Sequence, residues 1–127
     1  MEILKLDGFN NIYYIEPFPK EWQELFKNDK KSEERYSGWL DNKLRILDEN
    51  PIFFTRCHQS FEYVDNSKPQ ICSIHQRSKK NPRALYYLLI DKNKAVLLTP
   101  FLEKSKSDYK LAVSRAEQRV KKLLKGE

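Results

Sequence analysis

The chain has 127 residues, with 39% hydrophobic and 13% aromatic side chains, enough for one folded domain over residues 1–127. Its three glycines and six prolines exclude a fibrous or disordered protein, and no apolar run approaches the roughly 20 residues that cross a bilayer. The acidic N-terminal segment lacks the apolar stretch of a signal peptide. We therefore expect a cytoplasmic protein without a membrane partner, in which Cys57 and Cys72 are free thiols.

The formal net charge of +6 is distributed unevenly along the chain. Residues 1–70 carry ten Lys/Arg and thirteen Asp/Glu, a net charge of −3, whereas residues 71–127 carry fourteen and five, a net charge of +9. A one-sided basic half is typical of proteins that bind a polyanion. The distribution therefore favours a phosphate backbone as the partner over a surface that is charged only for solubility.

The first half of the chain predicts a short strand followed by two helices. Ile12–Ile15 is β-branched and aromatic, as strands usually are, and prolines follow it. Apolar residues then recur at helical spacing from Pro19 to about residue 28, and again after Ser32, a plausible N-cap. Asn50-Pro51 is expected to end the second helix. The acidic half is thus predicted to be mainly a helical hairpin.

The second half predicts strands over Phe61–Val64, Ile71–Arg77, Arg83–Ile90 and Ala95–Thr99, followed by a helix from Ser107 to Lys125. Short connections make neighbouring strands antiparallel. We therefore predict an α+β fold in which an N-terminal helical hairpin packs on a small antiparallel sheet with a C-terminal helix. All helices are expected on one side, which leaves the other face of the sheet partly open.

A candidate site follows from the alternation of side chains along the predicted strand Ile71–Arg77. Ser73, His75 and Arg77 share one face, which is too polar for a core and is expected to face a ligand. Arg83 begins the next strand nearby. Arg and Lys neutralise a phosphodiester, His or Tyr moves protons, and aromatic rings stack on bases. The residues expected to complete this patch are Lys79, Lys80, Lys104, Lys106 and Tyr109.

Other kinds of site fit the sequence poorly. Its three glycines lie too far apart for a phosphate-binding loop or a dinucleotide fingerprint. Cys57, His58, Cys72 and His75 supply the ligand types of a zinc site, but two are adjacent and two face opposite sides of a strand. No cluster of carboxylates is suited to two magnesium ions. We expect no metal and no cofactor, so any RNA cleavage would be metal-independent.

Several stretches of the second half match the pattern of a known family. They are Ile71–His75, Asn81–Tyr87 with its arginine before an aromatic strand, and Phe101–Ser105, with Ala116 and Arg119 in the last helix. On these motifs the chain resembles the RelE-superfamily toxins, in particular their HigB-like, phage-derived branch. The match covers about half of the chain in detail. Two positions depart from the family pattern: His75 stands where an arginine is more usual, and Glu103 where the first of two lysines is.

The resemblance implies a RelE/ParE-like fold and the toxin of a type II toxin–antitoxin pair. Such toxins bind the decoding site of the ribosome and cleave messenger RNA there, using the RNA's own 2′-hydroxyl and no metal. Arg83 would stabilise the scissile phosphate, and His75 or Arg77 would hold it or move a proton. The catalytic residues predicted in this way are Arg83, His75, Arg77 and Lys104, and the RNA-binding residues are Lys79, Lys80, Lys106 and Tyr109.

The expected partners are messenger RNA, the ribosome and a cognate helix-turn-helix antitoxin of the HigA-like kind. Two alternatives remain open at this point. One is a ParE-like toxin that poisons DNA gyrase without nuclease chemistry, and the other is a phage protein that binds nucleic acid without enzymatic activity. The grouping of His75 with Arg77 and Arg83 favours cleavage, although a shared fold alone does not decide between these functions.

The toxin hypothesis predicts that the chain, induced alone in a bacterium, arrests growth, and that co-expression of its antitoxin restores growth. The reason is that a toxin acting on translation stops every cell that lacks the antitoxin. Growth curves after induction, with soluble protein verified by immunoblot, measure the effect. Normal growth in cells that contain the soluble protein would contradict the hypothesis.

Overall fold

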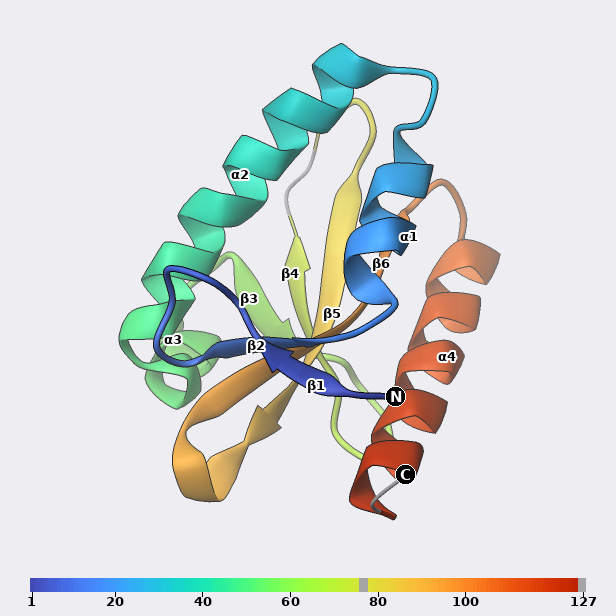
Figure 1. Ribbon diagram of the computed structural model, residues 1–127. Coiled ribbons are helices and arrows are strands. Elements are labelled where there is room, and N and C mark those ends of the chain that lie inside the picture. The colour runs from blue at the N-terminus through green and yellow to red at the C-terminus, as the bar shows by residue number, and fades with distance from the viewer. Residues whose placement is uncertain (76–77, 126–127) are drawn as a thin grey trace.

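The computed structural model describes residues 1–75 and 78–125, which form a six-stranded mixed sheet and four α-helices (Figure 1). Two short strands precede the helices, and the longest helix of the chain, α2, leads directly into α3. In chain order the elements are β1 (Ile3–Lys5), β2 (Ile12–Ile15), α1 (Phe18–Leu25), α2 (Lys30–Glu49), α3 (Pro51–Cys57), β3 (Phe61–Tyr63), β4 (Cys72–His75), β5 (Pro82–Leu89), a 3₁₀ turn (Ile90–Lys92), β6 (Lys94–Leu102) and α4 (Lys106–Leu124).

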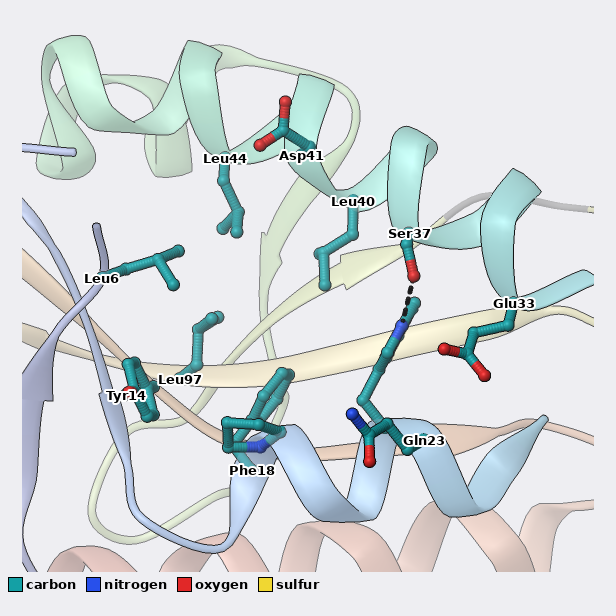
Figure 2. A pocket seen from close by; sticks show the side chains of 12 residues that line it. Leu6, Tyr14, Phe18, Gln23, Glu33, Ser37, Leu40, Asp41, Leu44 and Leu97 are labelled. Atoms are coloured by element: carbon teal, nitrogen blue, oxygen red, sulfur yellow. Dashed lines mark hydrogen bonds between the residues drawn. The ribbon is translucent and has the colours of Figure 1, made fainter. Parts of the chain in front are cut away.

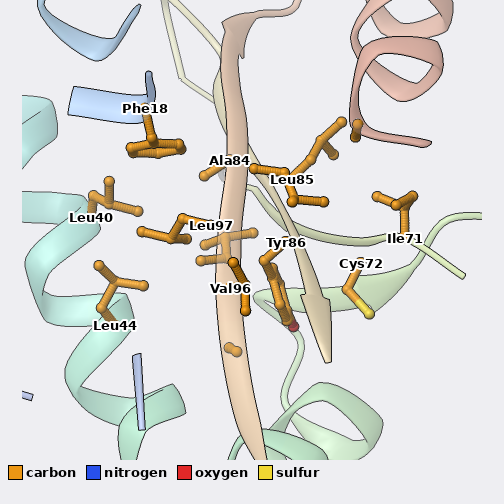
Figure 3. Packing of buried hydrophobic residues seen from close by; sticks show 14 of the residues in the cluster. Phe18, Leu40, Leu44, Ile71, Cys72, Ala84, Leu85, Tyr86, Val96 and Leu97 are labelled. Carbon is orange, nitrogen blue, oxygen red and sulfur yellow. The ribbon is translucent and has the colours of Figure 1, made fainter. Parts of the chain in front are cut away.

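The sheet has the strand order β1-β2-β6-β5-β4-β3. β2 pairs with β6 in parallel, and the other pairs are antiparallel. β5 and β6 lie at the centre and are buried along most of their length, because helices cover both faces. Figure 3 shows Leu97 facing Leu40 and Leu44 of α2 on one side of the strands, whereas Leu85 lies toward the other side, where α4 packs.

The predicted architecture, an N-terminal helical hairpin on an antiparallel sheet with all helices on one side, is wrong. Two strands, β1 and β2, precede the helices, and the parallel pairing of β2 with β6 makes the sheet mixed. The sequence could not show this pairing, since 78 residues lie between Ile15 and Lys94 and no local pattern encodes which strands meet. α4 covers the face that was expected to stay partly open.

Helix boundaries differ from prediction at two caps. Asp29, rather than Ser32, caps α2, because its carboxylate accepts the Ser32 backbone N–H at 3.1 Å. Asn50-Pro51 ends α2 but also begins α3: the Asn50 side chain accepts the Phe53 N–H at 3.2 Å, and proline suits the first helical position. α3 was missed because this pair was interpreted only as a stop signal.

Two side-chain contacts fix helices to the sheet. Arg119 of α4 donates to both carboxylate oxygens of Glu21 in α1, and its Nη1 also donates to the Leu98 carbonyl oxygen at 2.7 Å. The hydroxyls of Thr55 in α3 and Tyr86 in β5 share a buried hydrogen bond of 2.6 Å. Burial raises the pKa of the Tyr86 phenol. No helix in the described part of the chain is long and apolar enough to cross a membrane.

The Thr55–Tyr86 pair predicts a non-additive effect on stability. Tyr86→Phe should lower the free energy of unfolding by about 1–3 kcal/mol, because the buried Thr55 hydroxyl then has no partner. Adding Thr55→Val should recover part of the loss, since no unpaired polar group remains. Urea unfolding of the wild type, both single variants and the double variant measures the coupling. Strictly additive losses would show that the two hydroxyls do not depend on each other.

Candidate functional site

The strand register brings polar side chains from three strands onto one face of the sheet. Glu62 of β3 lies opposite Ser73 of β4, and His75 of β4 lies opposite Arg83 of β5. Ser73 and His75 are two residues apart and therefore point to the same side, as do their partners across the ladder. Arg83 in turn lies opposite Phe101 of β6. The described residues thus place a polar cluster at one end of the α4-covered face.

Arg83 is the centre of this cluster. Its Nε donates to Glu103 Oε1 at 2.6 Å, and its Nη1 donates to Glu62 Oε1 at 3.2 Å and to the Ser73 hydroxyl at 3.4 Å. Its side chain is only 18% exposed. Nη2 donates to none of the described residues, so one edge of the guanidinium remains for a ligand. The arginine is therefore held firmly, and two carboxylates partly offset its charge.

His75 lies beside Arg83 on the neighbouring strand. Its Nδ1 is 3.5 Å from Glu62 Oε1, within ion-pair distance, but it is buried and makes no hydrogen bond to a described residue. With Nδ1 turned toward Glu62, Nε2 is the nitrogen that remains for a proton transfer.

The first turns of α4 complete a pocket of about 360 Å³ beside the arginine. Ser105 and Asp108 form a reciprocal capping box that fixes this helix start. The Arg83 guanidinium lies over the Tyr109 ring, 5.4 Å from its centroid. Partial burial raises the pKa of the Tyr109 phenol, although the cation of Arg83 acts in the opposite direction. The residues that line the pocket are Glu62, Arg83, Glu103, Lys106, Tyr109 and Lys110.

The loop between β4 and β5 carries two of the predicted RNA-binding residues. Lys79 is exposed, whereas the Lys80 ammonium lies 3.2 Å from an Asp29 carboxylate oxygen at the start of α2. Hydrogen bonds from Ser32 and the ion pair with Lys80 lower the pKa of Asp29 to about 2. Lys80 therefore anchors the loop to α2. Lys79, the other lysine of this loop, forms no ion pair with a described residue.

The structure thus brings some predicted residues together and separates others. Arg83, Lys106 and Tyr109 line one pocket, and His75 lies against Glu62, which lines the same pocket. Lys104 lines a different hollow, between α1 and α4, with Leu111 and Arg115. Arg77 lies outside the described residues.

Two residues of the cluster were missed as site residues. Glu62 follows the first residue of a three-residue strand, and only the register of β3, β4 and β5 places it beside His75 and Arg83. Glu103 could be noticed in the sequence as a departure from the lysine of the resembling family. Its role as the acceptor for the Arg83 Nε–H depends on the pairing of β5 with β6.

A second hollow, of about 310 Å³, lies between α1 and α2 on the opposite face of the sheet (Figure 2). Its walls are mainly apolar and include Leu6, Leu40 and Leu97, and the Trp22 indole N–H donates to the Ser37 hydroxyl across it at 2.8 Å. None of the predicted site residues lines it. In residues 1–75 and 78–125, no group of three or more His, Cys, Asp or Glu side chains is placed to hold a metal ion.

The low pKa of Asp29 predicts how its contribution to stability depends on pH. In Asp29→Asn the helix cap is retained, because asparagine also caps well, but the charge is lost. A depressed folded-state pKa stabilises the fold above the unfolded value of 3.8, and this contribution is lost as pH falls through about 2. The melting-temperature difference between wild type and variant should be constant near neutral pH and shrink in this acidic window. A difference that does not change with pH would contradict this assignment.

Comparison with known proteins adds no family assignment to this geometry. The chain matches no protein-family model, no curated protein and no solved structure. The chemistry of the site has to follow from its own residues.

Proposed function

We propose that the chain is a metal-independent endoribonuclease. The observation that carries the proposal is the convergence of Arg83 and Glu62 in the wall of a pocket that also presents two lysines, with His75 lying against Glu62. These groups supply what cleavage of a phosphodiester by the neighbouring 2′-hydroxyl requires: a group that accepts a proton, a fixed cation for the phosphate, and further cations for the RNA backbone.

In the proposed reaction, Nε2 of His75 removes the proton of the 2′-hydroxyl while Glu62 holds the imidazole ring in place. The 2′-oxygen then forms a new bond to phosphorus, and the bond from phosphorus to the 5′-oxygen breaks. The departing 5′-oxygen takes a proton from solvent, which leaves a 2′,3′-cyclic phosphate and a 5′-hydroxyl. The free edge of Arg83 stabilises the negative charge that develops on the phosphate oxygens.

The charges around the pocket support different roles for the arginine and the lysines. Two carboxylates hold Arg83. They fix the orientation of its guanidinium and also weaken the electrostatic field of its positive charge. Lys106 and Lys110 form no ion pair with a described residue, so their full charges can attract a polyanion. We expect the arginine to act mainly on the transition state and the lysines mainly on affinity.

The biological setting of the reaction is proposed from the resemblance to HigB-like toxins. In this proposal the substrate is messenger RNA on the ribosome, the result is inhibition of translation in the cytoplasm, and a helix-turn-helix antitoxin neutralises the activity. An acidic segment of such an antitoxin would complement Lys106 and Lys110.

Arg83→Ala is expected to lower the cleavage rate by about 10²–10³, because a fixed donor to the developing charge is lost. Arg83→Lys should restore only part of the rate, since an ammonium keeps the charge but lacks the planar fork. The measurement is the rate of formation of cyclic-phosphate ends on RNA, first with EDTA on a short RNA and then on programmed ribosomes in magnesium buffer.

Arg56→Ala is the matched control, because Arg56 is an exposed arginine on α3. It should cleave like the wild type. Melting curves establish that each variant is folded, and His75→Asn provides a second test if Arg83→Ala is unstable. Full activity in folded Arg83→Ala and His75→Asn, or loss of short-RNA cleavage on chelation, would overturn the proposed mechanism.

A further inference from the structure

The Glu103 carboxylate is presented to the pocket in a fixed position. It directly follows β6, and its backbone N–H donates to the Asn81 carbonyl oxygen at 3.0 Å. Oε1 accepts the Arg83 Nε–H at 2.6 Å, and Oε2 has no partner among residues 1–75 and 78–125. A carboxylate can accept about four hydrogen bonds in all. Glu103 therefore retains capacity to accept from a ligand while it holds the arginine.

The pocket wall also carries donors beside Glu103, together with a second carboxylate, Glu62, which accepts from Arg83. Lys106 and Lys110 carry ammonium groups, which can donate but not accept hydrogen bonds. The capping box at Ser105 fixes the backbone from which both lysines project. A hollow of about 360 Å³ has room for one nucleobase, and its wall combines ammonium donors with the free oxygen of Glu103 and, on the β3 side, that of Glu62.

This combination matches one RNA base better than the others. Guanine presents two adjacent N–H donors, at N1 and N2, and continues along the same side with two acceptors, O6 and N7. Adenine and cytosine each present a single exocyclic amine beside an acceptor, and uracil presents one ring N–H between two acceptors. Only guanine can donate twice to one carboxylate while accepting from a neighbouring ammonium.

We propose that this pocket binds a guanine base, with Glu103 accepting from N1–H and N2–H and a lysine of α4 donating to O6 or N7. The base pocket rests on the proposed function for RNA as its ligand, because the 3′-phosphate of the bound guanosine then lies toward Arg83 and His75. Cleavage would follow guanosine.

The test compares the binding of 3′-GMP, 3′-IMP and 3′-AMP to the full chain by calorimetric titration. Inosine lacks only the N2 amine, so 3′-GMP should bind about tenfold or more tightly than 3′-IMP, the effect of one hydrogen bond to a charged group. Adenine cannot make the pair of bonds, so 3′-AMP should be no tighter than 3′-IMP.

Glu103→Gln removes the acceptor edge but keeps an oxygen that can accept from Arg83 Nε. Because the variant also gains positive charge, the informative quantity is the ratio of 3′-GMP to 3′-AMP affinity, which should fall close to one. Glu49→Gln, an exposed glutamate at the end of α2, makes the same charge change elsewhere and should leave the ratio unaltered.

Equal affinities of the wild type for the three nucleotides, or no binding of any of them, would overturn the guanine pocket whatever Glu103→Gln does. Mapping cut sites on RNA separates the two proposals. Cleavage without preference for guanosine contradicts the base pocket and supports the nuclease, whereas selective 3′-GMP binding without cleavage supports the base pocket and contradicts the nuclease.

Discussion

The antiparallel pairing of β5 with β6 is the constraint on which the other parts of the molecule depend. Helices α1 and α2 bury the strands on one face and α4 buries them on the other, so the register of the pair determines which residues each face presents to these helices. The same register places Arg83 opposite Phe101 and brings Glu103, two residues farther, to the guanidinium. A slip of one residue would turn Arg83 to the opposite face.

The uneven charge of the chain is partly neutralised inside the fold. Acidic residues of the first half hold basic residues of the second: Glu21 binds Arg119, Asp29 binds Lys80, and Glu62 lies against Arg83. These pairs join α1 to α4, α2 to the β4–β5 loop, and β3 to β5. The basic half is therefore less available to a polyanion than its net charge suggests, and Lys106 and Lys110 are the cations of the pocket wall that form no ion pair with a described residue.

The site combines a cation held by two carboxylates with lysines that form no ion pair to a described residue. An arginine held by two carboxylates loses little conformational freedom when it meets a phosphate, but its field is weakened. The lysines of α4 have the opposite properties, with long free side chains and an undiminished charge. In the proposed nuclease, orientation and affinity would therefore come from different residues, and Glu103 would act on both the arginine and the choice of base.

The sequence by itself determined most of the local elements and the residue types of the site. Short apolar and aromatic runs between turn residues predicted β2 to β6, and helical spacing predicted α1, α2 and α4, whereas β1 and α3 were missed. The basic residues and His75 near the β4–β5 loop predicted a site for phosphate chemistry. Only the tertiary structure decided that β2 joins β6 in parallel, that α4 covers the second face, and that Glu62 and Glu103 meet Arg83. The physical reason is range: periodicity and caps act over a few residues, whereas strand order and ion pairs between distant elements depend on how the whole chain buries its apolar surface.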